Sequence, residues 1–110
     1  MEEVKKTEGK EKKKDDYMIM ELAVPVEFEQ MTIKQIDFTK LREMTLDELS
    51  DVYDIYAAMG EKEGVMQEFS VKFVKLLLHH VTGYPLEALG KISAKDAVRL
   101  KARIYRFFYL

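Results

Sequence analysis

Cysteine is absent from this sequence of 110 residues, and its apolar runs are short. Without cysteine there can be no disulfide, no thiol nucleophile and no zinc site with cysteine ligands. No apolar run approaches the roughly 20 residues of a membrane-spanning helix, and the charged N-terminal stretch lacks the apolar centre of a signal peptide. We therefore expect a soluble cytoplasmic protein.

Motifs that carry chemistry are also missing. No nucleophile stands beside a base, and neither a Gly-x-Ser-x-Gly turn nor a glycine-rich phosphate loop occurs. The only histidines, His79 and His80, are neighbours on a predicted helix and point about 100° apart, so they cannot share a metal ion as an i, i+4 pair could. Asp47, Asp51 and Asp54 share one helix face but lack the spacing of a calcium loop. We expect no enzyme, no cofactor and no metal site.

Charge is unevenly distributed along the chain, although the net charge is only -2. Residues 1–16 carry six acids and six lysines and have almost nothing to bury, which predicts a disordered arm over 1–16 and a single domain over 17–110. Residues 43–68 carry eight acids and one lysine, whereas residues 91–110 carry six basic residues and one acid. The domain is therefore predicted to be electrically polarised.

The first part of the domain favours β-structure. Between Tyr17 and Phe38, β-branched and aromatic residues alternate loosely with charged ones, which predicts a two-stranded hairpin with its turn near Glu29 to Thr32. Pro25 predicts that the first strand lies at an edge or bends there. Because an isolated hairpin is barely stable in water, its apolar face must lie on the helices.

Two helices are predicted next. Thr45 and Glu48 have the spacing of a capping box at the start of a helix over about 45–59, whose apolar positions include Leu46. A second, more apolar helix over about 66–82 has His80 in its apolar sector and is stopped by the glycine that follows it.

The last third of the sequence combines several turn signals. Gly83 can close a helix, Pro85 can open a short helical turn that Gly90 ends, and Ser93 can cap a final helix over about 94–108. The predicted fold is α+β: an N-terminal β-hairpin packed on a small bundle of three main helices plus a short helical turn.

The final helix is strongly amphipathic. Its apolar face carries Ala97, Leu100, Ile104, Phe107 and Phe108. The opposite face carries Lys95, Arg99, Arg103 and Arg106. Such cations could lie on nucleic-acid phosphates, although the chain is acidic overall and the helix lacks the Asn and Gln residues that read bases. They could equally meet the acidic first helix, within one chain or between copies.

Four large residues follow one another at the end of the sequence, from Phe107 to Leu110. Consecutive helical residues cannot all face one core, so some of them are either a contact site or part of a frayed end from which Phe108 folds back. We take Tyr105, Phe107, Phe108 and Leu110 as candidate partner-binding residues. The basic candidates beside them are Arg99, Arg103 and Arg106.

Several short motifs resemble one family. They are Val-Pro-Val-x-Phe in the hairpin, Ile-Asp-Phe-x-x-Leu-Arg after it, Met-Thr-Leu-Asp-Glu-Leu at a helix start, Thr-Gly-Tyr-Pro-Leu-Glu-Ala-Leu at the joint and Ile-Ser-Ala-Lys-Asp before the last helix. Over about residues 19–108 the chain resembles the tail assembly chaperones of long-tailed bacteriophages and prophages. It departs from their pattern at Met44, where the family usually has proline, and at Glu29 and Gln30, where the family has a glycine turn.

The resemblance implies a non-enzymatic protein that coats the long helical tape measure protein while tail tube subunits polymerise around it. It further implies the cytoplasm of a host bacterium as location, absence from the mature virion, and the tail tube protein as a further partner. We expect a homo-oligomer that binds neither membrane nor nucleic acid. The alternatives are a small nucleic-acid-binding accessory protein that uses the basic final helix, and a phage-encoded structural adaptor.

Overall fold

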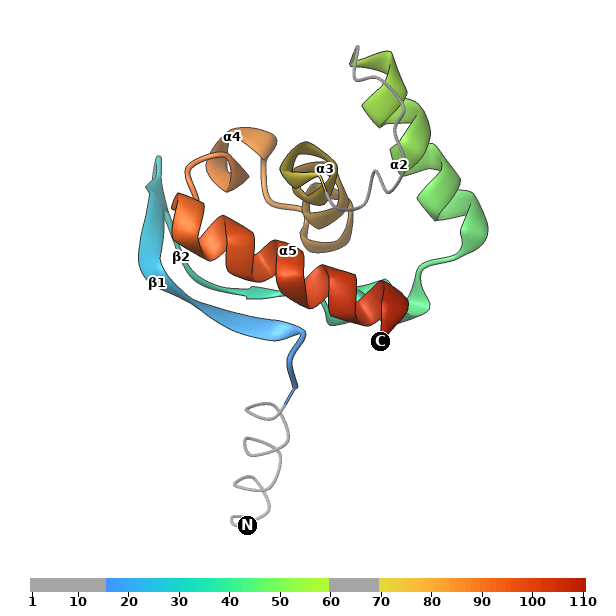
Figure 1. Cartoon of the computed structure of the whole chain (residues 1–110). Coiled ribbons are helices and arrows are strands. Elements are labelled where there is room, and N and C mark those ends of the chain that lie inside the picture. Colours follow the sequence, from blue (N-terminus) through green and yellow to red (C-terminus); the bar gives the residue numbers. More distant parts are fainter. Residues whose placement is uncertain (1–15, 60–69) are drawn as a thin grey trace, which may run out of the picture.

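The computed structural model describes residues 16–59 and 70–110, and its fold is the predicted α+β arrangement. A two-stranded hairpin curls past α5 and α4, α3 lies in the middle of the helices, and α2 leans away on the far side of α3 (Figure 1). The elements are β1 (Ile19–Phe28), β2 (Met31–Asp37), the short 3-10 helix η1 (Thr39–Glu43), α2 (Leu46–Ala58), α3 (Val71–Thr82), α4 (Leu86–Leu89) and α5 (Ala94–Tyr109).

The hairpin turns where its sequence predicts. β1 and β2 are antiparallel, and the turn between them holds Glu29 in the left-handed region at φ 53°. β1 is an edge strand of this two-stranded sheet, as Pro25 predicts, and the register shifts around Pro25, between Glu21 and Val26. Apolar residues of both strands are buried against the helices: Met20, Leu22, Val26, Ile33 and Ile36.

Helix α2 begins with the predicted capping box. The Thr45 hydroxyl accepts the N–H of Glu48 at 3.2 Å, and the Glu48 carboxylate accepts the N–H of Thr45 at 3.2 Å. Val52 and Tyr56 are buried. Leu46, which was predicted to lie on the same face, is 81% exposed. It lies six positions before Val52 and therefore about 120° from it around the helix axis.

Helix α3 supplies the largest apolar face. Ser70 caps its start, and Gly83 ends it in the left-handed conformation at φ 81°, as predicted. The predicted start at about residue 66 is wrong, because Ser70 is extended at φ -78° and ψ 137° and α3 begins only at Val71; residues 66–69 lie outside the described residues. His80 is exposed rather than buried in the apolar sector, because at that level it meets the polar first turn of α2, with Nε2 4.0 Å from a Glu48 oxygen.

One hydrophobic core joins the hairpin to the helices. Its largest fully buried apolar side chains come from both: Met18, Met20, Ile33, Ile36, Phe38, Phe73, Leu77, Leu78, Leu100 and Ile104. The predicted arm falls on residues 1–15, which lie outside the described residues, and on Asp16. Asp16 binds Arg42 through two hydrogen bonds of 2.9 and 3.0 Å, and so links the start of the hairpin to η1.

Candidate partner-binding surface of helix α5

Asp96 fixes the first turn of α5 to the hairpin. The Ser93 hydroxyl caps the helix by accepting the N–H of Asp96 at 3.2 Å. The two carboxylate oxygens of Asp96 in turn accept the N–H groups of Ala23 and Val24, each at 3.1 Å. These two residues lie where the register of β1 shifts, so Asp96 satisfies backbone donors that leave the regular ladder there.

Asp96 is fully buried and charged. Burial would raise the pKa of its carboxyl group, but hydrogen bonds from the N–H groups of Val24 and Ala23, from Ser93 and from Arg99 outweigh burial and lower the pKa below the ordinary value. The Arg99 guanidinium lies 2.7 Å from the carboxylate. The spacing of Ser93 and Asp96 predicts a helix cap, but it contains no sign of the strand partner more than 70 residues away.

The predicted basic residues come together on the side of α5 that faces β1. Arg103 donates to the carbonyl oxygens of Tyr17 at 3.1 Å and Ile19 at 3.4 Å, and the Arg106 guanidinium lies 4.0 Å from the centre of the Tyr17 ring. Burial, and then repulsion by Arg99 and Arg106, lowers the pKa of Arg103. These arginines therefore contact Asp96, Tyr17 and the start of β1, and not the acidic α2 as the sequence allowed.

The aromatic candidates are divided between two environments. Phe107 and Phe108 are half-buried against the core, with ring centres 5.1 Å apart, and they line a hollow of about 180 Å³ beside the start of α2. Tyr105 and Leu110 are exposed. Tyr105 and Leu110 can therefore meet a partner without rearrangement, whereas Phe107 cannot. Phe108 folds back on the core, which was one of the two alternatives for this end of the helix.

A further row of exposed residues runs along the flank of α5 that faces away from β1. Its members follow one another at intervals of four, four, three and four residues: Ala94, Val98, Ala102, Tyr105 and Tyr109. We call this row the α5 stripe. Val98 is 62% exposed, and the rings of Tyr105 and Tyr109 lie 5.2 Å apart. Small residues at one end and aromatic rings at the other form a surface on which a second helix can pack closely.

Sequence reasoning found only Tyr105 among the residues of the α5 stripe. The missed signal was the spacing itself, which repeats like one side of a coiled-coil seam. The consecutive aromatic residues drew attention to Phe107 and Phe108, although α5 turns both of them toward the core.

Chemistry at other places in the described residues is limited. No group of three or more histidines, aspartates and glutamates within 16–59 and 70–110 is arranged to hold a metal ion. His79 directs Nδ1 at the carbonyl oxygen of Tyr84, 2.7 Å away, and so helps to close the turn after α3. No helix in the described part of the chain is long and apolar enough to cross a membrane.

Comparison with known proteins adds no relative. No family model matches the chain, and neither does any curated protein or solved structure at a significant level. Function is therefore inferred from the surfaces of the protein, of which the α5 stripe is suited to apolar contact with another helix.

Proposed function

We propose that this chain is a non-enzymatic phage tail assembly chaperone, which binds helical segments of the tape measure protein and promotes tail tube assembly. The observation that carries the proposal is the α5 stripe, an apolar row left exposed on a helix whose opposite side is firmly held. The motif resemblance supplies the biological setting: the cytoplasm of a host bacterium, the tail tube protein as a second partner, and absence from the mature virion.

The physical task of such a chaperone matches this surface. A long helical protein exposes apolar residues before the tube encloses it, and a neighbouring helix can cover them by packing along its own apolar row. The contact must later be released, so each copy should bind weakly and many copies should act together. A single row with alanines at two of its five positions buries little area per copy, which favours weak and reversible binding.

Nucleic-acid binding is less well supported. A phosphate contact would have to draw on the exposed Lys95 and Arg106, because Arg99 binds Asp96 and Arg103 binds the carbonyl oxygens of Tyr17 and Ile19. Moving Arg99 onto a phosphate would leave the buried Asp96 without its cation.

Co-expression with a tape measure protein of a long-tailed phage, followed by affinity capture, tests the proposal. Ala102→Glu places a charge in the α5 stripe and should reduce capture about tenfold or more, because the glutamate would have to be desolvated in the contact. Ala57→Glu is a matched control, since Ala57 is an exposed alanine on α2. Both variants should fold, because glutamate is a good helix former.

Three outcomes would contradict the proposal. Failure of the wild-type chain to retain the helical protein would reject the function, and equal capture by the Ala102→Glu and wild-type chains would remove the α5 stripe from it. Micromolar binding of DNA or RNA that weakens steeply with salt, without capture of the helical protein, would favour the nucleic-acid alternative.

A further inference from the structure

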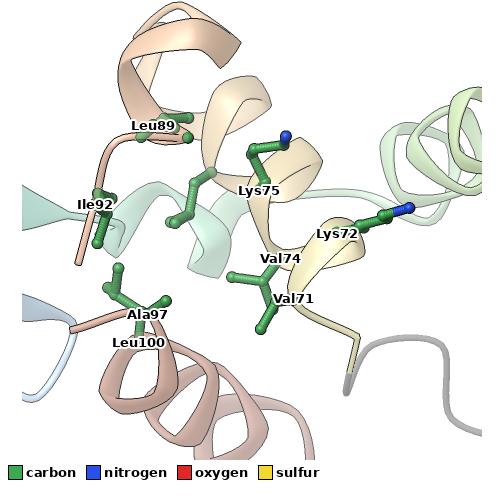
Figure 2. Close-up of a pocket in the computed structure, with 10 residues that line it drawn as sticks. Val71, Lys72, Val74, Lys75, Leu89, Ile92, Ala97 and Leu100 are labelled. Carbon is green, nitrogen blue, oxygen red and sulfur yellow. The ribbon is translucent and has the colours of Figure 1, made fainter. Parts of the chain in front are cut away.

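An apolar groove lies between α3, α4 and α5, apart from the α5 stripe. It has a volume of about 200 Å³, and its lining includes Val74 and Leu78 of α3, Leu89 of α4 and Leu100 of α5. Figure 2 shows these helices around the groove and the amines of Lys72 and Lys75 pointing away from its floor. The α5 stripe is centred about 100° around α5 from Ala97, which lines the groove.

The described residues that line the groove carry one sign of charge. Among them the charged members are Lys72 and Lys75, and none is an acid. Val71, the first residue of α3, is 50% exposed at the edge of the groove. An occupant should therefore offer apolar side chains with carboxylates beside them.

Helix α2 carries such a combination on its outer side. Ile55 and Met59 are one turn apart and 52% and 54% exposed, and Asp51 lies one turn before Ile55 on the same side. Asp54 flanks them, and within its range α2 has four acids and no basic residue. We call the row formed by Asp51, Ile55 and Met59 the α2 ridge.

The α2 ridge cannot reach the groove of its own chain. The inner side of α2 packs on α3, where Tyr53 stacks on Phe73 at 4.9 Å and Tyr56 meets the edge of the same ring at 5.6 Å. In Figure 1, α3 stands between α2 on one side and α4 on the other. Two complementary surfaces thus lie on opposite sides of one molecule.

We infer that the α2 ridge of one copy docks in the α3–α4–α5 groove of a second copy. The contact joins two different surfaces, so each added copy leaves one groove and one ridge available, and the assembly grows as a ring or an open chain. Its apolar part is the insertion of Ile55 and Met59 over Leu78 and Leu100. Its specificity comes from acids on α2 that lie near the lysines of α3.

Two substitutions block one surface each. Val71→Glu introduces an acid at the groove, where it opposes the acids of the α2 ridge, and it suits the first turn of α3 because glutamate is favoured at a helix N-terminus. Ile55→Lys places a cation on the ridge, and its i, i+4 pairing with Asp51 favours α2. Each variant should weaken self-association about tenfold or more.

Matched controls use the exposed Ala57 on the other side of α2. Ala57→Lys and Ala57→Glu introduce the same charges as the two test substitutions and should self-associate like the wild type. Circular dichroism should show that all four variants keep the helical signal of the wild type.

Sedimentation velocity of the full chain over a range of concentrations gives the decisive comparison. Wild type should form species larger than a dimer as concentration rises, and each blocked variant alone should remain a monomer. A mixture of Val71→Glu and Ile55→Lys chains should form heterodimers, because the ridge of the first chain and the groove of the second are both unaltered.

A wild-type chain that stays monomeric at about 1 mM, where even a contact of millimolar Kd is populated, would overturn the inference. So would undiminished association of either blocked variant, or a mixture that forms no heterodimer. Ala102→Glu separates this result from the proposed function: it should self-associate normally although it fails to capture the tape measure protein.

Discussion

Helices α5 and α2 are attached to the body of the protein in different ways. α5 is held to β1 by polar contacts, with Asp96, Arg99 and Arg103 bound to strand backbone or to each other, and its apolar face also enters the core. α2 meets the body through apolar contacts: Val52 and Tyr56 are buried in the core, and the rings of Tyr53 and Tyr56 contact Phe73. Directional hydrogen bonds fix one orientation of α5, whereas the apolar contacts of α2 are non-directional.

The two helices therefore suit different contacts, α5 with a partner helix and α2 with a second copy of the chain. A rigidly held α5 presents the α5 stripe in one orientation, which reduces the entropy lost when a partner helix docks. The α2 ridge lies on the outer side of α2, so it can meet the groove of a neighbouring copy while Val52 and Tyr56 stay in the core.

The largest loss of stability is expected from a substitution that removes the contact between α2 and α3. Phe73 is fully buried beneath the two tyrosines, so Phe73→Ala should lower the free energy of unfolding by roughly 3–5 kcal/mol. Urea unfolding gives this loss, and hydrogen exchange should show that the amides of α2 lose protection before those of α5. Phe73→Leu, which keeps most of the volume, should be milder. An unchanged unfolding midpoint for Phe73→Ala would mean that α2 is held by something else.

The next largest loss of stability is expected from a substitution that removes the hydrogen bonds between α5 and β1. Asp96→Ala leaves the N–H groups of Ala23 and Val24 without their acceptor and should lower the free energy of unfolding by roughly 2–4 kcal/mol. Asp96→Asn keeps one acceptor oxygen and should lose less. The amides of residues 23 and 24 should exchange faster in both variants. If they exchange as slowly as in wild type, the contact of α5 with β1 does not depend on this carboxylate.

Local signals in the sequence were enough to predict most helix ends, although they missed η1 and the start of α3 at Val71. Thr45, Gly83 and Ser93 act through residues three or four positions away, so their spacing alone predicts where a helix begins or ends. Pro25 predicts the irregular strand for the same local reason. The predicted α+β fold is accordingly confirmed.

Contacts between distant residues were not predictable in this way. The bond from Asp96 to Val24 spans 72 positions, and nothing near either residue indicates the other. The basic side of α5 looks the same in sequence whether it faces solvent or β1, because arginine stems cover apolar surface while their guanidinium groups bind backbone oxygens. The α5 stripe was missed for the related reason that its definition depends on which sides of α5 are covered.

Lowering the pH tests the polar attachment of α5 separately from the apolar attachment of α2, because it protonates Asp96 without changing the sequence. Hydrogen bonds hold the pKa of folded Asp96 below its ordinary value, so its contribution is fully present above the unfolded pKa of about 3.9 and is lost as pH falls through the folded pKa. Wild type should thus lose stability between pH 5 and 2, roughly the window in which such carboxylates titrate. Asp96→Asn should show a smaller loss in urea unfolding over that range. Equal acid sensitivity of both chains would place the responsible carboxylate elsewhere.

The smallest effect concerns the ion pair at the start of the hairpin. Arg42 binds Asp16 at 2.9 Å, and a hydrogen bond from Arg42 is the leading cause of the lowered pKa of Asp16, but the arginine side chain is half exposed and solvent screens the pair. Arg42→Gln should therefore shift the urea-unfolding midpoint less than Asp96→Asn does. The comparison between α5 and α2 assumes that β1 is secured through Asp96. If Arg42→Gln shifted the midpoint more than Asp96→Asn, the hairpin would be held chiefly at its first residue, and the fixed orientation of α5 would be a consequence of the Asp16 contact instead.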